Sequence, residues 1–220
     1  MNLVHALYEP EGPGPHPTLL ALHGWGANAL DLLGLAPHLA GGRFLLLCPQ
    51  GPVEVPLGPA TGYGWFPITT GAPPDPAAFE EALGALRAFL DQAVERYPVR
   101  REKLAVLGFS QGGVMAYALA FSQPERFSAL AALSSWFPDL LAERFRPRAP
   151  ITLPTLVHHG SQDPLVPVER GRQSVENLRS LGVPVTYREF DMGHEITPRS
   201  LAALSDWLRE KVISPIWTPG

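Results

Sequence analysis

Apolar runs of strand length alternate with segments of helical spacing along almost the whole chain of 220 residues. Runs such as 18–22 and 44–48 are short and bounded by turn residues, which is typical of buried strands. The longest helical segment begins at Asp75 and Pro76, an N-cap followed by a proline, and ends before Pro98. Strands that alternate with helices predict an α/β fold, with a mainly parallel sheet and helices on both faces.

The predicted elements fill a single domain of residues 1–220. About seven strands are expected, at 3–8, 18–22, 44–48, 104–109, 129–133, 155–159 and 185–190. Helices are expected at 29–40, 76–97, 112–121, 139–145, 168–181 and 197–213. Residues 49–75 hold seven prolines and five glycines and are predicted to form a long loop. Loops of that length inside a compact domain are usually functional or disordered, which makes this one a candidate cover for a substrate pocket.

Composition and charge exclude several classes of protein. A hydrophobic content of 45% is enough for a sizeable core and excludes a disordered chain. With a net charge of −4 we expect no nucleic-acid partner, and with apolar runs no longer than strands we expect no stable membrane insertion. The single cysteine excludes an internal disulfide, and the N-terminus lacks a signal-peptide pattern, so we expect a cytoplasmic protein.

A G-x-S-x-G pattern at 108–112 carries the strongest chemical signal in the sequence. It lies between a buried strand and a helix of small residues. In this context Ser110 occupies a strained turn that lifts its hydroxyl above the sheet. Side chains two positions to either side would collide there, which explains Gly108 and Gly112. The amide of Gln111 then lies at a helix N-terminus, where unpaired N–H groups favour an anion.

A serine nucleophile needs a base that is itself oriented by an acid, and the chain supplies both. Asp163 follows the strand at 155–159, and His194 follows the last strand. The order Ser110, Asp163, His194 is that of the α/β-hydrolases, and all three residues follow the carboxyl ends of strands. Asp191, three residues before His194, is the alternative acid, and we favour Asp163.

The segment His23-Gly24-Trp25-Gly26 follows another predicted strand, and its glycines allow a sharp turn. In this fold a loop at that position gives the second oxyanion N–H group. The predicted oxyanion hole is therefore formed by the backbone amides of Trp25 and Gln111. We expect His23 to fix this loop by hydrogen bonds rather than to act as a base.

Aromatic residues near the strand ends are candidate walls of an apolar substrate pocket. The predicted pocket residues are Trp65, Phe66, Trp136 and Leu165. His158 and His159 are adjacent on a predicted strand and point to opposite faces, so one ion cannot readily use both. We expect no metal site.

Seven segments between residues 23 and 195 together resemble the phospholipase/carboxylesterase family of serine hydrolases, which includes the acyl-protein thioesterases. These segments are His23-Gly24, Pro49-Gln50-Gly51-Pro52, Gly64-Trp65-Phe66, Gly108-Phe-Ser-Gln-Gly-Gly113, Leu133-Ser-Ser-Trp136, His159-Gly-Ser-Gln-Asp163 with Val166-Pro167, and Met192-Gly-His-Glu195. The resemblance implies an α/β-hydrolase fold and an ester or thioester hydrolase without a metal or organic cofactor. It implies Ser110 as nucleophile, His194 as base and Asp163 as the acid that orients the base.

One departure from the family pattern bears on the substrate. The thioesterase-like members typically carry an acidic residue soon after the first His-Gly, where this chain has Trp25-Gly-Ala-Asn28. The departure counts against protein deacylation more than against general esterase activity. Two alternatives stay open, an enzyme like the dienelactone hydrolases that acts on small metabolites, and a non-catalytic binding protein with this fold. The sequence also leaves open whether the chain forms a homodimer.

Overall fold

A computed structural model describes residues 3–68, 74–146 and 150–214. Among these residues seven strands form one sheet, in which only the first strand runs antiparallel to its neighbour. In spatial order the strands are β1 (His5–Tyr8), β3 (Leu45–Pro49), β2 (His16–Leu22), β6 (Val99–Phe109), β7 (Ala129–Leu133), β8 (Thr155–Gly160) and β9 (Val185–Phe190). Each predicted strand is present, and the mainly parallel α/β fold is confirmed.

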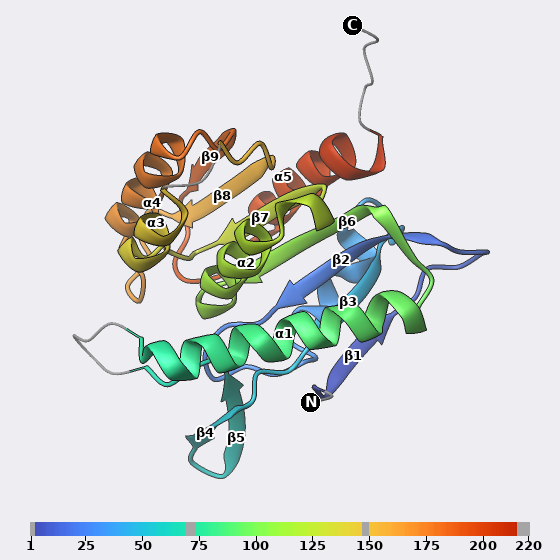
Figure 1. Ribbon diagram of the computed structural model, residues 1–220, viewed down its shortest axis with the longest axis horizontal. Coiled ribbons are helices and arrows are strands. Elements are labelled where there is room, and N and C mark those ends of the chain that lie inside the picture. The colour runs from blue at the N-terminus through green and yellow to red at the C-terminus, as the bar shows by residue number, and fades with distance from the viewer. Residues whose placement is uncertain (1–2, 69–73, 147–149, 215–220) are drawn as a thin grey trace, which may run out of the picture.

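Helices cover both faces of this sheet. One face packs against α1 (Pro76–Arg96), α2 (Gln111–Ser122), α3 (Asp139–Phe145) and α4 (Val168–Ser180). The other face packs against the 3₁₀ helix η1 (Leu33–His38), α5 (Pro198–Leu208) and the π-helical turn η3 (Arg209–Ile213). A further 3₁₀ turn, η2 (Pro124–Arg126), joins α2 to β7. Figure 1 shows α1 and α2 in front of the sheet and α5 behind it. None of the helices in the described ranges is both long and apolar enough to span a membrane.

Alternation along the central strands supplies both cores. In β2, Leu20 and Leu22 face the core under α1 and α2, whereas Leu19 and Ala21 face the core under η1 and α5. All four are at most 1% exposed. A strand buried on both faces has to be apolar throughout, which is why the sequence signal was a continuous run rather than an alternation. Burying each leucine contributes roughly 1.5–3 kcal/mol.

The segment 29–40 is not the α-helix that its apolar spacing predicts. Only Leu33–His38 is helical, and its geometry is 3₁₀. Asn28 begins the segment with a turn in which its side chain accepts a hydrogen bond from the Leu30 amide at 2.9 Å. Pro37 has no N–H to give to an α-helical ladder. Local turn chemistry and a proline therefore override the apolar spacing here.

The predicted loop at 49–75 contains a β-hairpin that the sequence reading missed. β4 (Val53–Leu57) pairs with β5 (Ala60–Gly64) in a separate two-stranded sheet, which projects from the body of the molecule in Figure 1. The chain reverses at Gly58, whose φ of 65° favours glycine. Pro56 argues against a strand in the sequence, because proline is tolerated in a sheet only on edge strands. β4 is such an edge strand, so the proline is accommodated. Residues 69–73 of the predicted loop lie outside the described residues.

The first turn of α1 offers a test of a helix cap predicted from sequence. The Asp75 carboxylate accepts a hydrogen bond from the Ala77 amide at 2.9 Å. We expect Asp75→Ala to lower the free energy of unfolding by about 1 kcal/mol, since an N-cap acceptor is lost. Glu81→Ala, at an exposed position on the same helix, is the matched control and should change it by less than about 0.5 kcal/mol. Urea unfolding followed by circular dichroism measures both, and equal effects would contradict the role of the cap.

Candidate active site

Ser110 lies between β6 and α2 in a backbone conformation that is rare for residues other than glycine. Its φ is 51° and its ψ is −122°. The surrounding chain holds this conformation, because the Ser110 amide donates to the Leu133 carbonyl at 2.9 Å and the Gly113 amide donates to the Ser110 carbonyl at 2.9 Å. Such strain costs about 1–3 kcal/mol and occurs mainly at functional sites. The strained turn predicted from the G-x-S-x-G pattern is present.

Glycines are required around Ser110 by the close approach of neighbouring backbone. A Cβ atom on Gly108 would lie 2.2 Å from the Gly112 carbonyl oxygen, and one on Gly112 would lie 2.1 Å from that of Leu22. Real Cβ atoms do not approach other atoms so closely. The pattern is thus a packing requirement that allows β6, α2 and the end of β2 to meet at Ser110.

Ser135 is a second support of this turn, and the sequence analysis did not single it out. Its hydroxyl donates to the Ser110 carbonyl at 2.7 Å, so this oxygen accepts two hydrogen bonds. The same side chain occupies the space beside Gly113, where a Cβ atom would lie 2.4 Å from its oxygen. No role was predicted for this serine from the sequence, although Leu133-Ser-Ser-Trp136 lies at the end of a predicted strand and is one of the segments that resemble the family.

Asp163 and His194 form a hydrogen-bonded pair at the same edge of the sheet. The distance from His194 Nδ1 to Asp163 Oδ2 is 2.7 Å, and the Asp163 side chain is completely buried. The other carboxylate oxygen accepts from the amides of Leu165 and Val166, at 2.9 and 2.8 Å. A carboxylate only accepts, so Nδ1 carries the proton and Nε2 of the neutral ring keeps its lone pair.

His194 lies against the residue that precedes the serine. Its ring centroid is 4.8 Å from that of Phe109, and 13% of its side chain is exposed. Asp191, the alternative acid, is exposed and accepts a hydrogen bond from the side chain of Gln162 at 3.2 Å. The geometry therefore pairs His194 with Asp163 and places Asp191 in a surface contact.

His23 fixes the loop that follows β2. Its Nε2 accepts a hydrogen bond from the Gly51 amide at 3.0 Å, and its Nδ1 donates to the Gly24 carbonyl at 2.7 Å. Burial lowers the pKa of His23, although the hydrogen bond to Gly24 and the charge of Asp31 act in the opposite direction. The ring is thus held as one neutral tautomer, as a structural hydrogen-bonding role requires.

The side chain of Gln111 joins this loop region to α2. Its oxygen accepts from the Trp65 amide at 2.8 Å, and its nitrogen donates to the Phe66 carbonyl at 2.7 Å. Trp65 in turn donates from its indole nitrogen to the His23 carbonyl at 2.9 Å. Sequence reasoning used only the amide of Gln111. The available signal was a glutamine at the start of an otherwise apolar helix, and in the structure its side chain is fully buried and has partners.

The side chains of the four predicted pocket residues and of Trp25 differ in exposure. Trp65 and Phe66 are 1% and 2% exposed and belong to the core. Trp136 is half-buried against the same core. Trp25 is 36% exposed and covers Gly64, where a Cβ atom would lie 2.2 Å from its ring, and Leu165 is 72% exposed beside Asp163. Trp25 and Leu165 thus present apolar surface near the site, whereas Trp65 and Phe66 hold its backbone in place.

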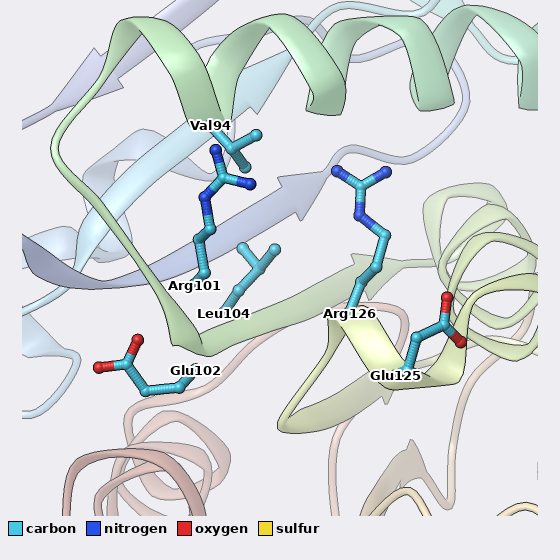
Figure 2. Close-up of a pocket in the computed structure, with 6 residues that line it drawn as sticks. All are labelled: Val94, Arg101, Glu102, Leu104, Glu125 and Arg126. Atoms are coloured by element: carbon cyan, nitrogen blue, oxygen red, sulfur yellow. The ribbon is translucent and has the colours of Figure 1, made fainter.

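A hollow at the amino-terminal end of β6 is separate from these residues. Figure 2 shows that it is lined by Val94, Arg101, Glu102, Leu104, Glu125 and Arg126. It lies at the start of β6, whereas Ser110 follows the end of that strand. Its arginines already pair with carboxylates, Arg126 with Asp91 at 2.6 Å for example. The described residues also contain no cluster of three or more His, Cys, Asp or Glu side chains that could hold a metal ion.

Comparisons with known proteins agree on one family. Residues 5–212 match the model of the family described as Phospholipase/Carboxylesterase. The acyl-protein thioesterase 1 of Mycosarcoma maydis is 30% identical over 92% of this chain and 93% of its own length. The acyl-protein thioesterase 1 of Gibberella zeae is 29% identical over 86% of this chain and 85% of its own length. The crystal structure of esterase PE8 superposes with a TM-score of 0.85 at 25% identity, covering 96% of this chain and all of the other.

The crowding at Gly112 predicts a large loss of stability from one methyl group. Gly112→Ala would drive a Cβ atom into the Leu22 carbonyl oxygen, and we expect a loss of about 3 kcal/mol in the free energy of unfolding. Gly84→Ala in α1 is the matched control, because a Cβ atom there meets nothing within 4 Å. It should stabilise the protein by about 0.5–1 kcal/mol. Urea unfolding of both variants tests the pair, and similar effects would contradict the packing argument.

The buried imidazole of His158 predicts a loss of stability in acid. Burial, with a smaller contribution from the charge of Arg188, lowers the pKa of His158 from 6.5 to about 3. Between these two values the unfolded chain binds a proton that the folded chain does not. The stability therefore falls as the pH drops below 6.5, by up to about 1.4 kcal/mol per pH unit.

His158→Leu removes this proton uptake by the unfolded chain. We expect the variant to lose about 2 kcal/mol less stability than the parent between pH 7 and pH 5. Urea unfolding at the two pH values measures the difference, and any effect of the substitution that is independent of pH cancels. Equal losses in parent and variant would show that His158 is not held neutral by the fold.

Proposed function

The chain belongs to the phospholipase/carboxylesterase family of α/β-hydrolases, and on that premise we propose that it cleaves carboxylic esters or thioesters through a Ser110–His194–Asp163 triad. The observation that carries the proposal is a strained serine whose preceding residue, Phe109, packs against a histidine whose Nδ1 is hydrogen-bonded to a buried aspartate. The family and its relatives support an esterase-type hydrolase, and these three residues supply its chemistry.

In the proposed reaction the Ser110 hydroxyl attacks the carbonyl carbon of the substrate. His194 takes the hydroxyl proton at Nε2 and later gives it to the leaving group, so that an acyl-enzyme forms. Water then attacks the acyl-enzyme by the same route and releases the acid. Asp163 keeps the imidazole in the tautomer that accepts at Nε2 and stabilises the imidazolium that forms. The two amides that bind its other oxygen keep the carboxylate in place.

The amides of Trp25 and Gln111 are proposed to bind the oxyanion of the tetrahedral intermediate. Gln111 is the first residue of α2, where the amide has no partner within the helix and the helix dipole favours negative charge. Gly24 brings the other loop within reach, since a Cβ atom there would lie 3.3 Å from Ser110 Cβ. A preorganised donor of this kind is worth about a hundred- to a thousand-fold in rate.

Exposed apolar surface around these residues suits a substrate with an apolar part. Trp25 and Leu165 flank the site from the loop after β2 and the loop that carries Asp163. Esters of small alcohols and esters of acyl chains both fit such a rim. The names of two relatives, acyl-protein thioesterase 1, indicate acylated proteins as the substrates of those relatives. The segment Trp25-Gly-Ala-Asn28, which lacks an early acidic residue, favours general ester hydrolysis over protein deacylation in this chain.

Substitution of the triad is the direct test, with hydrolysis of a p-nitrophenyl ester as the measurement. We expect Ser110→Ala to lower kcat by roughly four to six orders of magnitude and Asp163→Asn by about four, because the nucleophile and the correct tautomer are lost. Asp191→Asn is the matched control at the alternative acid and should stay within about threefold of the parent. Full activity of Ser110→Ala would refute the proposal, and a large loss in Asp191→Asn would reassign the acid.

Two further measurements separate the alternatives. A fluorophosphonate probe should label the parent and leave Ser110→Ala unlabelled, whereas a non-catalytic binding protein would not be labelled although folded. A panel of esters and thioesters of increasing acyl length then distinguishes an acyl-chain hydrolase from an enzyme of dienelactone-hydrolase type. Turnover that falls steadily from acetyl to octanoyl esters would favour the small-metabolite alternative.

A further inference from the structure

Two adjacent histidines of β8 are both buried but have different surroundings. His158 is 1% exposed and His159 is not exposed at all. Neither ring nitrogen of His158 has a hydrogen-bond partner among the described residues, and its ring packs edge-on against Phe190. Nε2 of His159, in contrast, lies 2.8 Å from the Val166 carbonyl oxygen and 3.8 Å from Asp163 Oδ2. Only His159 therefore faces the loop that carries the proposed triad acid.

The surroundings of His159 fix the position of its proton. Nε2 faces two oxygen atoms that only accept, so the proton is on Nε2 and points toward them. Nδ1 faces the backbone at Gly171, where a Cβ atom would lie 2.5 Å from it, and it has no partner among the described residues. A proton on Nδ1 would be buried without an acceptor. The ring thus donates from Nε2 toward the loop 163–166.

We propose that His159 is a positioning residue that holds Asp163 in register with His194, an inference that rests on the proposed triad. The loop is closed twice, since the Val166 amide donates to Asp163 Oδ1 while the Val166 carbonyl accepts from His159. The second bond attaches the far end of the loop to β8, the strand that leads into it. The partial positive charge of the same N–H group also lies near Asp163 Oδ2, the carboxylate oxygen that accepts the hydrogen bond from His194.

Without this attachment the far end of the loop loses its bond to β8, whereas the near end keeps the bond from the Asp163 amide to the Gly160 carbonyl at 3.3 Å. The carboxylate is then anchored to the sheet from one side only. A shift of about 1 Å in a catalytic group can cost about a hundredfold in rate. His159 is completely buried and its ring contacts the Val166 carbonyl and Asp163, so it is not exposed to a substrate. Its loss should therefore lower kcat and leave KM unchanged. A residue with only a packing role would lower the yield of folded protein without this separation of kcat from KM.

The test compares four variants of the full chain in p-nitrophenyl ester hydrolysis. His159→Leu removes the donor, and His158→Leu is the control for loss of a buried histidine on the same strand. His159→Gln places an amide nitrogen near the position of Nε2, whereas His159→Asn has the same chemistry with a shorter reach. We expect kcat to fall about 10- to 100-fold in His159→Leu and His159→Asn at unchanged KM, and to stay within about fivefold in His159→Gln and His158→Leu.

The outcomes separate this inference from the function on which it rests. Equal kcat in His159→Leu and His158→Leu, or no advantage of His159→Gln over His159→Asn, would overturn the inference. The comparison of Gln with Asn decides the matter even if His159→Leu fails to fold. Activity that persists in Ser110→Ala would instead overturn the proposed function. An inactive Ser110→Ala together with fully active His159 variants would leave the triad standing and remove only the positioning role.

Discussion

The strained turn at Ser110 is the constraint on which the rest of the site depends. A residue with a φ of 51° between a buried strand and a helix has to be held by its neighbours, and three elements share this task. The end of β7 accepts from its amide, the first turn of α2 and Ser135 donate to its carbonyl, and the end of β2 packs directly on Gly112. The favourable packing and hydrogen bonds of these neighbours therefore offset the backbone strain of the turn.

A buried polar network transmits this order to the loops around the serine. Gln111 binds the backbone at Trp65 and Phe66, Trp65 binds the carbonyl of His23, and His23 binds Gly51. Each bond in this series is well shielded from water, so a missing partner would cost about 1–3 kcal/mol. Such a network specifies one arrangement of the segment after β2, the segment after β3 and the start of α2. The amides proposed to bind an oxyanion are thus in place before any substrate arrives.

The sequence was informative wherever a pattern had a single physical cause. Continuous apolar runs located the strands, the capping residues located α1 and α5, and the glycines around Ser110 located the turn. The sequence was less informative where local and tertiary effects competed. Asn28 and Pro37 turned a predicted helix into η1, and Pro56 hid a strand whose partner could not be inferred from spacing. The sequence favoured Asp163 over Asp191 although both follow strand ends, and in the structure Asp163 holds the hydrogen bond to His194 while Asp191 contacts the side chain of Gln162.

The hairpin of β4 and β5 holds the loop after β2 through main-chain atoms. The Gly26 amide donates to the Tyr63 carbonyl at 2.8 Å, and the Tyr63 amide donates to the Ala27 carbonyl at 2.7 Å. Contacts of this kind do not depend on which side chains the hairpin carries. Its outer turn at Gly58 can therefore lengthen or change in composition while the register at Tyr63 stays the same. The turn at Gly58, which could diversify, is thus separate from the main-chain contacts at Tyr63, which set the geometry of the site.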